Sequence, residues 1–258
     1  MNMDFSNPDH KRVFFEVHAG LPRQGPGNKK CTARALALNT NLPASPHVLD
    51  LACGPGMQTR DLAALMPHAQ IKAIDLHEEF IAEAKALLRD DSLARVMFEV
   101  GDMAADSEPN DSYDLVWCEG AAYIIGVETA LERWRRLLKI GGAIAFTDCC
   151  WLKPNPPTEL ASFWNEYPDM TDAQTRRTQI EDLDYILLGD FVLPANAWLD
   201  DYYHPLQQRV TKFRSTHRHD AAANGVLDGI QQEIDLFNRY QDYYGYVFFV
   251  VTPAPTAH

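Results

Sequence analysis

The stretch Val48-Leu49-Asp50-Leu51-Ala52-Cys53-Gly54-Pro55-Gly56-Met57-Gln58-Thr59 decides the fold of this chain. An apolar run that contains an acid leads into two glycines, and residues with helical spacing follow. Glycine has no Cβ, so the backbone at Gly54 and Gly56 can adopt unusual dihedral angles and lie directly against a ligand. A strand, a glycine turn and a helix in this order are typical of ligand-binding α/β sheets.

Two residues near the glycines bear on which ligand the turn would bind. A dinucleotide-binding turn reads GxGxxG, and Thr59 stands here at the third glycine position. Asp50 adds a negative charge. This charge would stabilise a bound cationic ligand but not a bound pyrophosphate. The pattern therefore favours a cationic, nucleoside-bearing ligand, although a turn that merely connects strand and helix is the alternative, because GxG alone is a weak signal.

The segments after His47 alternate between strand and helix patterns. We expect strands at 47–52, 70–75, 95–100, 113–118 and 142–149, with helices at 56–66, 77–89 and 127–138, and two earlier helices at 7–18 and 31–42. This alternation predicts a doubly wound, mostly parallel sheet in an α/β fold. The double glycine Gly141-Gly142 is expected to reverse the chain between helix 127–138 and the strand after it.

The pattern changes after Trp151, where three prolines interrupt any continuing element. We expect helices at 158–167 and 171–182, a strand at 185–193, helices at 197–216 and 221–243, and a seventh strand at 246–252. Helices of this length need an apolar surface to bury against. The sequence therefore predicts a helical insertion before the last strand of a seven-stranded sheet.

A second acid, Asp75, stands about 20 residues beyond the glycine turn. Strand, acid, GxG and this second acid resemble the first two motifs of the class I S-adenosylmethionine-dependent methyltransferases. The resemblance covers residues 20–150 and, more loosely, the closing strands. It implies a Rossmann-like methyltransferase fold, S-adenosyl-L-methionine as cofactor, and in-line transfer of a methyl group to the nitrogen or oxygen of a small-molecule acceptor.

The resemblance also implies a domain organisation. We expect one methyltransferase domain over residues 1–258. Its expected parts are an N-terminal helical cap and loop at 1–45, a cofactor-binding core at 46–150, a partly helical acceptor-site cap with strand six at 151–245, and a closing strand at 246–252.

Residues at the strand ends are candidates for binding the donor. The Asp75 carboxylate is expected at the carboxyl edge of the sheet, where it can accept hydrogen bonds from ribose hydroxyls, although an aspartate there can also cap a helix. By the resemblance, Leu76 lies against the adenine, the Asp102 carboxylate accepts from the adenine amino group, and the Met103 N–H donates to the ring. A turn aspartate followed by a core methionine is the alternative reading of the last two.

The predicted donor-binding residues are Asp50, Ala52, Gly54, Gly56, Gln58, Thr59, Asp75, Leu76, Gly101, Asp102, Met103, Glu119, Gly25 and Gly27. The two early glycines belong to a loop that we expect to fold over the carboxylate of the donor. Arg23, Lys29 or Lys30 would then lie near that carboxylate, and a flexible surface loop is the alternative.

Three residues are candidates for the catalytic step. Glu119 follows the strand 113–118 and is expected to hold the donor's ammonium, stabilise its sulfonium or accept a proton, the alternative being an exposed side chain. Tyr123 is expected to line the transfer path. His204, in the insertion, is a candidate base because an unperturbed histidine titrates near neutral pH. Positioning does most of the work in such a transfer, so no covalent nucleophile is needed.

Composition limits the partners. A net charge of −13 and a pI near 5.0 argue against nucleic acid or an anionic membrane as partner. The five cysteines lack CxxC spacing, so neither a disulfide framework nor a zinc site is expected, and no metal is predicted. No apolar segment reaches spanning length. We therefore expect a cytoplasmic monomer or homodimer whose acceptor is a small molecule, aromatic or an amine, since aromatic residues are dense in the insertion.

Two other functions stay open at this point. One is a nicotinamide-dependent oxidoreductase, which Thr59 and the lack of a tyrosine-lysine catalytic pair disfavour. The other is a protein that binds S-adenosylmethionine without catalysis. A nucleic-acid methyltransferase is disfavoured by the acidic balance and by Glu119-Gly120-Ala121-Ala122, which stands where such enzymes carry an NPPY-like tetrapeptide.

Overall fold

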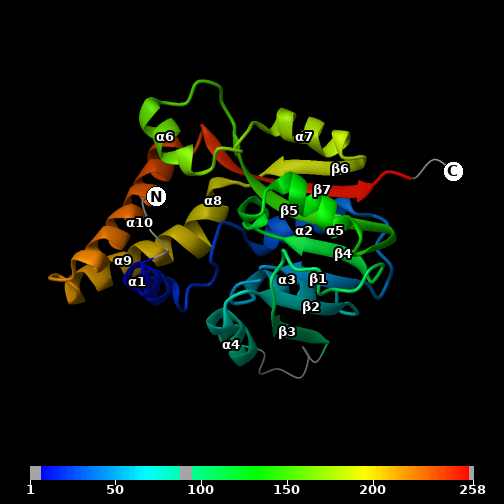
Figure 1. The fold of residues 1–258 in the computed structure, drawn as a ribbon, viewed down its shortest axis with the longest axis horizontal. Coiled ribbons are helices and arrows are strands. Elements are labelled where there is room, and N and C mark those ends of the chain that lie inside the picture. The colour runs from blue at the N-terminus through cyan, green and yellow to red at the C-terminus, as the bar shows by residue number, and fades with distance from the viewer. Residues whose placement is uncertain (1–6, 88–94, 256–258) are drawn as a thin grey trace.

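A computed structural model describes residues 7–87 and 95–255 and shows one seven-stranded sheet (Figure 1). Its order is β3-β2-β1-β4-β5-β7-β6, in which β7 alone runs antiparallel to its neighbours. The strands are β1 (His47–Leu51), β2 (Gln70–Asp75), β3 (Val96–Val100), β4 (Tyr113–Cys118), β5 (Leu138–Trp151), β6 (Tyr185–Val192) and β7 (Tyr244–Pro253). The predicted doubly wound, mostly parallel sheet is confirmed.

Helices cover both faces of the sheet. One face packs against α2 (Lys29–Leu38), α3 (Met57–Leu65) and α4 (Glu78–Leu87), and the other against α5 (Val127–Arg135) and α7 (Ala173–Asp182). Alternate residues of β1 serve the two layers, since Val48 belongs to the first apolar cluster and Leu49 to the second. A strand buried on both faces is what its unbroken apolar sequence predicts.

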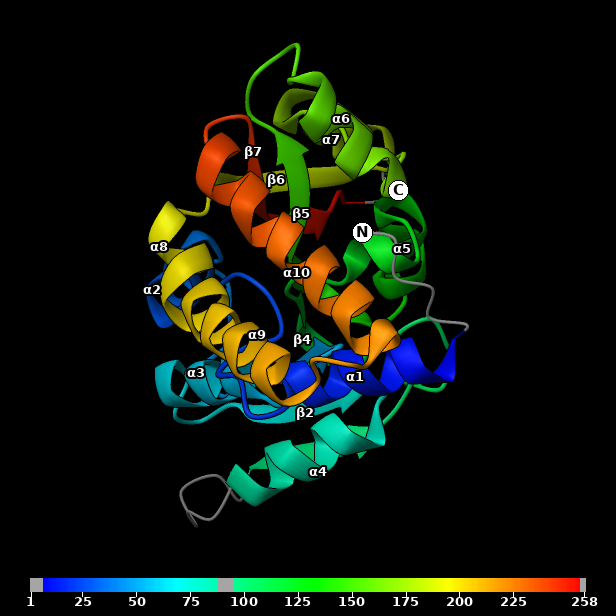
Figure 2. The same cartoon turned by 90° about the vertical axis from the view of Figure 1, so that its left-hand side faces the viewer.

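A third apolar cluster lies at one end of the sheet, where the helices that we call the cap helices pack together (Figure 2). These are α1 (Pro8–His18), α9 (His204–Thr216) and α10 (Ala221–Tyr240). Arg209 of α9 donates to the carbonyl oxygens of Glu16 and Val17 at 2.6 and 3.1 Å, so it satisfies the last turn of α1. The chain start and the late insertion therefore form one unit.

Short elements complete the second half of the chain. They are η2 (Ala122–Ile124), α6 (Thr158–Phe163), η3 (Trp164–Glu166), α8 (Ala195–Trp198) and a π-helical turn, η4 (Leu199–Tyr203). The single helix predicted at 197–216 is thus divided into three pieces. Pro205 explains the last division, because proline lacks the N–H that a helix interior needs but fits its first turn. No helix of the described residues is long and apolar enough to cross a membrane.

The predicted glycine turn before the fifth strand is wrong in detail. Helix α5 ends at Arg135, and Gly141 (φ 79°) lies inside β5. The pairing with β4 shifts there, from Tyr113 opposite Leu138 to Leu115 opposite Ala143, so the extra residues form a bulge. The helix predicted at 31–42 begins and ends earlier, and positions 88–89 of the helix predicted at 77–89 lie outside the described residues.

Candidate active site

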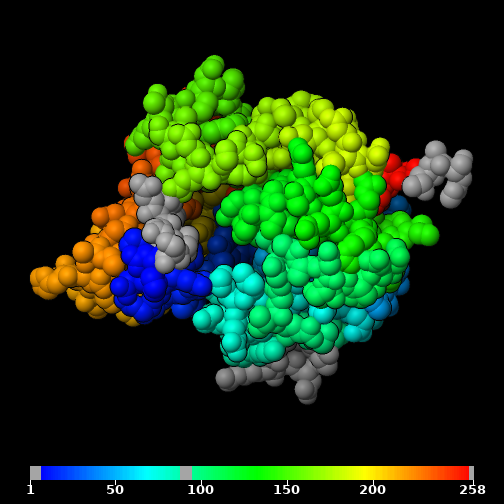
Figure 3. Space-filling model, viewed as in Figure 1, coloured from blue at the N-terminus to red at the C-terminus, as the bar shows by residue number. Residues whose placement is uncertain are grey.

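A cavity of about 350 Å³ lies at the carboxyl edge of the first four strands. Its walls include residues 52–55 after β1, 75–77 after β2, 102–103 after β3 and 119–121 after β4. Figure 3 shows a hollow in the surface between the blue N-terminal segment and the cyan and green segments that follow β2 and β4. The edge of the sheet predicted from the motifs is therefore the edge that carries the cavity.

The two glycines of the turn have different functions. Gly54 (φ 53°) lines the cavity, and its N–H donates to Asp75 Oδ2 at 2.8 Å. Gly56 (φ 83°) faces the core instead, because a Cβ there would lie 2.6 Å from Phe98 Cζ. Gly56 does not line the cavity, and its missing Cβ lets the turn pack on β3.

Asp75 both organises the turn and lines the cavity. Its Oδ1 accepts from the His77 N–H at 2.9 Å, and its Oδ2 accepts from Gly54. Each carboxylate oxygen has two lone pairs, so both can still accept from a ligand hydroxyl. The capping function and the predicted ribose-binding function are therefore compatible.

Three more of the predicted residues line the cavity. Leu76 is 62% exposed and lines the cavity, so its apolar side chain is open to a ligand. Asp102 also lines the cavity, while its Oδ1 accepts from the Ala104 N–H at 2.8 Å. Met103 lines it too, with its carbonyl held by Trp134 Nε1 at 3.2 Å. Gly101 does not line the cavity; a Cβ there would lie 3.2 Å from Ile74.

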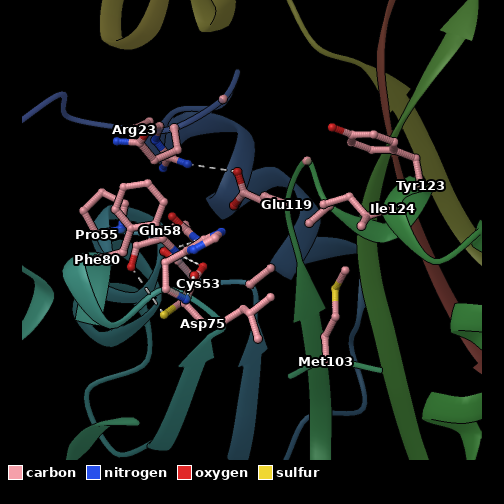
Figure 4. Close-up of a pocket in the computed structure, with 18 of the residues that line it drawn as sticks. Arg23, Cys53, Pro55, Gln58, Asp75, Phe80, Met103, Glu119, Tyr123 and Ile124 are labelled. Atoms are coloured by element: carbon pink, nitrogen blue, oxygen red, sulfur yellow. Dashed lines mark hydrogen bonds and ion pairs between the residues drawn. The ribbon is translucent and has the colours of Figure 1, made fainter. Parts of the chain in front are cut away.

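A buried ion-pair cluster lies above the turn, and Figure 4 shows Arg23 and Glu119 joined across the cavity. The Arg23 guanidinium donates to Glu119 Oε2 at 2.9 Å and to Asp61 Oδ2 at 2.7 Å. Glu119 Oε1 also accepts from Trp117 Nε1 at 2.9 Å. Burial raises the pKa of Glu119, and the Arg23 charge opposes that shift. Glu119 is thus neither exposed nor free, and Arg23 Nε is left buried without a partner among the described residues.

The early loop closes over this ion pair. Gly25 and Pro26 line the cavity. Gly27 does not: a Cβ there would lie 2.5 Å from Glu119 Oε2, and its N–H donates to the Ala197 carbonyl of α8 at 2.9 Å. Lys29 and Lys30 are exposed and away from the cavity, so only one of the three basic residues predicted to lie near a ligand carboxylate lines it.

Asp50 and Thr59 support the turn from below. Asp50 is fully buried and its Oδ2 accepts from Thr59 Oγ1 at 2.5 Å, while its Oδ1 has no partner among the described residues. Burial raises the pKa of Asp50 to about 8, so its charge is largely absent at neutral pH. Neither residue lines the cavity, so its position does not support the ligand contact predicted for it. Gln58 does line it and donates to the Cys53 carbonyl at 2.9 Å; Ala52 lines it as well.

The structure separates the remaining catalytic candidates. Tyr123 of η2 lines the cavity, and Figure 4 shows its hydroxyl pointing toward the side where Glu119 lies. His204 is exposed at the start of α9 and does not line the cavity, so its predicted function as a base is not supported by its position. The two residues directly before His204, Tyr202 and Tyr203, are buried instead.

Sequence reasoning missed several apolar and neutral wall residues. These are Phe14, Gln24, Cys53, Pro55, Phe80, Gly120, Ala121, Ile124 and Ile125. Several of them adjoin the quoted motifs, so extending each motif by a few residues would have found them. Phe14 of α1 gave no signal, because its contact with the cavity depends on how the cap helices pack.

A family model described as a methyltransferase domain matches residues 48–142, the span from β1 into β5. Trans-aconitate 2-methyltransferase of Paracidovorax citrulli is 29% identical over 182 residues, which are 67% of this chain and 68% of that protein. Malonyl-[acyl-carrier protein] O-methyltransferase of Paenibacillus sp. is 29% identical over 105 residues, covering 40% of this chain and only 38% of its own length.

A solved structure is similar over almost the whole chain. The SAM-dependent methyltransferase from Geobacter sulfurreducens, in complex with S-adenosyl-L-homocysteine, has a TM-score of 0.80 at 22% identity. The superposition covers 94% of this chain and 98% of that one. At this identity the likeness shows the fold, including the insertion before the last strand.

Proposed function

We infer that the chain belongs to the class I S-adenosylmethionine-dependent methyltransferases, and on that premise we propose that it methylates a nitrogen or oxygen of a small molecule. The acceptor enters the cavity between α1 and the glycine turn. The observation that carries this proposal is the cavity itself, because the ends of four consecutive strands, a glycine turn and two carboxylates, Asp75 and Asp102, all line it.

The residues present fit S-adenosyl-L-methionine. The carboxylates of Asp75 and Asp102, at the ends of the neighbouring strands β2 and β3, suit hydroxyl and amino donors, and exposed Leu76 suits a flat apolar ring. The buried Arg23 Nε has no partner among the described residues and suits a carboxylate. Gly54 leaves space where any side chain would add a Cβ.

We assign each wall of the cavity one part of the donor. Asp75 accepts from the ribose, and Leu76, Asp102 and Met103 hold the adenine. Gly54, Gly25 and Arg23 hold the amino-acid end. When bound, S-adenosyl-L-methionine supplies an activated methyl group on a sulfonium, so the chain itself needs to bind, orient and exclude water.

Glu119 acts in this proposal through Arg23. Both of its oxygens already accept hydrogen bonds, from Arg23, Trp117 and Thr32. Its carboxylate therefore holds the guanidinium in place beside the cavity. We consequently place the base, where the acceptor needs one, outside the donor site.

Calorimetric titration with S-adenosyl-L-homocysteine tests the donor site. The wild type should bind it, and Asp75→Ala should weaken the affinity about 10- to 100-fold, since hydrogen bonds to a charged group contribute about 1.5 to 3 kcal/mol. Asp106→Ala is the matched control, because Asp106 is 73% exposed and does not line the cavity. Its affinity should equal that of the wild type.

Methyl transfer is measured with labelled donor and a metabolite library. Label in at least one small molecule supports the proposal. Binding without transfer to any acceptor would support a non-catalytic binding protein. Binding of NADH with no response to S-adenosyl-L-homocysteine would support a nicotinamide enzyme and overturn the proposal.

A further inference from the structure

A group of tyrosines that the donor site does not use lies between the cap helices and the sheet. We call Tyr123, Tyr202, Tyr203, Tyr244 and Tyr246 the tyrosine cluster. Trp198 of α8 packs among them, with ring centroids 4.8 Å from Tyr246 and 5.8 Å from Tyr203. The cluster thus joins η2, η4 and β7, which are distant in sequence.

One carboxylate lies within this cluster. Glu233 of α10 accepts from the Tyr203 hydroxyl at 2.9 Å. Burial, and after it the charge of Glu233, raises the pKa of Tyr123 to about 12. The same two causes raise the pKa of Tyr202, Tyr203 and Tyr244. The carboxylate therefore interacts with phenols on several sides.

The described neighbours of Glu233 are mostly uncharged, and its one printed side-chain hydrogen bond comes from Tyr203. Within residues 7–87 and 95–255, no lysine, arginine or histidine forms an ion pair with it. Burial raises the pKa of Glu233 itself, and the Tyr203 hydrogen bond and the charge of the N-terminal amine oppose that shift. Tyr244 Oη and Trp164 Nε1 are also buried without hydrogen-bond partners in this part of the structure. Burying polar groups without hydrogen-bond partners raises the free energy of the folded state, unless a ligand supplies the missing partners.

The tyrosine cluster adjoins the donor cavity at the end of β4. Tyr123 belongs to both, since it lines the cavity. Gly120 lines the cavity as well, and a Cβ there would lie 3.4 Å from the Tyr246 ring and 3.6 Å from its hydroxyl. A molecule held by the cluster would therefore reach the cavity beside Glu119.

The charges of the cavity favour a cationic acceptor over an anionic one. Asp75, Asp102 and Glu119 line it, and its only arginine or lysine in the described residues, Arg23, already pairs with Glu119 and Asp61. Since Arg23 is assigned to the carboxylate of the donor, an anionic acceptor would meet repulsion and no further arginine or lysine among the described cavity residues. The two relatives described above are named for the acceptors trans-aconitate and malonyl-[acyl-carrier protein]. Carboxylate acceptors of this kind would require a different set of side chains around the cavity.

We propose that Glu233 and the tyrosine cluster bind the protonated amine of the methyl acceptor, an inference that rests on the methyltransferase function proposed above. Tyrosine faces attract cations, and the carboxylate supplies the opposite charge. The amine gives one proton to a Glu233 oxygen: an N–H bond breaks, an O–H bond forms, and the electron pair stays on the nitrogen. The carboxylate becomes a neutral acid, and the nitrogen becomes a nucleophile.

Ligand-observed NMR tests this site with pairs of compounds that share one skeleton, each pair an amine and a carboxylate, such as 2-phenylethylamine and 3-phenylpropionate. The protein is saturated with S-adenosyl-L-homocysteine. Amine members should bind and carboxylate members should not. Glu233→Gln should weaken binding of the amines about 30-fold or more, because it leaves their charge unpaired.

Asp235→Asn is the matched control, since Asp235 lies on the same helix and is exposed. It should bind the amines as the wild type does, and thermal melting checks that both variants fold. Preferential binding of carboxylates, binding of no amine, or equal affinity in Glu233→Gln would overturn the inference. Calorimetry with S-adenosyl-L-homocysteine separates the two proposals: if the donor product binds and the amines do not, only the acceptor assignment fails.

Discussion

The Arg23 guanidinium donates to the Glu119 carboxylate over 2.9 Å and so joins the loop before α2 to the end of β4. The two side chains are 3% and 4% exposed. Removing one member of such a pair leaves the other charge buried, which is far more damaging than the pair's own net contribution. The closed shape of the loop over the cavity therefore depends on this contact.

We expect Glu119→Ala to lower the free energy of unfolding by about 3 to 5 kcal/mol and to weaken donor binding, because Arg23 loses its partner beside the cavity. Urea unfolding and calorimetry measure the two effects. Glu159→Ala removes a surface partner of Arg239, whose side chains are 46% and 51% exposed. That control should lose at most about 1 kcal/mol, and equal losses in the two variants would contradict the prediction.

Gly27→Ala should act through the same ion pair. A Cβ at Gly27 would lie 2.5 Å from Glu119 Oε2 and 2.7 Å from an Arg23 nitrogen, and its φ of +156° is unfavourable for a side chain. We expect a loss of about 1 to 3 kcal/mol, seen as a lower melting temperature. Gly25→Ala, two residues earlier, meets nothing within 4 Å and should melt as the wild type does. A similar decrease in both would show that loop flexibility, not the contact, matters.

Most of the fold could be predicted from local patterns. Strand β1 and the turn after it combine an unbroken apolar run with glycines, and parallel strands bring their carboxyl ends to one edge. That rule predicted the Asp75 carboxylate at the edge that carries the cavity, and the resemblance to the methyltransferases added Asp102. The bulge in β5 escaped prediction because Gly141 suits a turn and a bulge equally well.

The part of the site that the sequence did not reveal is the part made by distant contacts. Arg23 and Glu119 are 96 positions apart, and no local pattern pairs one particular arginine with one particular acid. His204 was chosen for its chemistry, yet the π-helical turn before it buries Tyr202 and Tyr203 and leaves His204 exposed. Contacts between segments that are distant in sequence decided both outcomes.

Gly56→Ala should destabilise the protein through β3. The new Cβ would lie 2.6 Å from Phe98 Cζ, and φ at this position is +83°. We expect a loss of about 2 to 5 kcal/mol from overpacking and backbone strain together. Phe98→Leu in the same chain should recover the packing part but not the strain, so a double-mutant cycle should give a coupling of about 0.5 to 3 kcal/mol. Additive losses would mean that Phe98 is not what excludes a side chain at Gly56.

Asp50 should make the stability fall as the pH rises. Burial raises its pKa from 3.8 to about 8, so between these values the folded state holds a proton that the unfolded state has released. The stabilisation that the folded state gains from this bound proton is complete below the pKa that Asp50 has in the unfolded state. It decreases by about 1.4 kcal/mol per pH unit as the pH rises, and it is lost once the pH has passed the pKa of the folded state. Asp50→Asn keeps an acceptor for Thr59 but does not titrate.

We therefore expect the difference in unfolding free energy between wild type and Asp50→Asn to shift in favour of the variant from about pH 4 to about pH 8. Urea unfolding at a series of pH values measures it. Asp106→Asn, at a side chain 73% exposed, controls for loss of one negative charge. Parallel curves for wild type and Asp50→Asn would show that Asp50 is ionised in the folded protein, and its charge would then act on a cationic donor from below the turn.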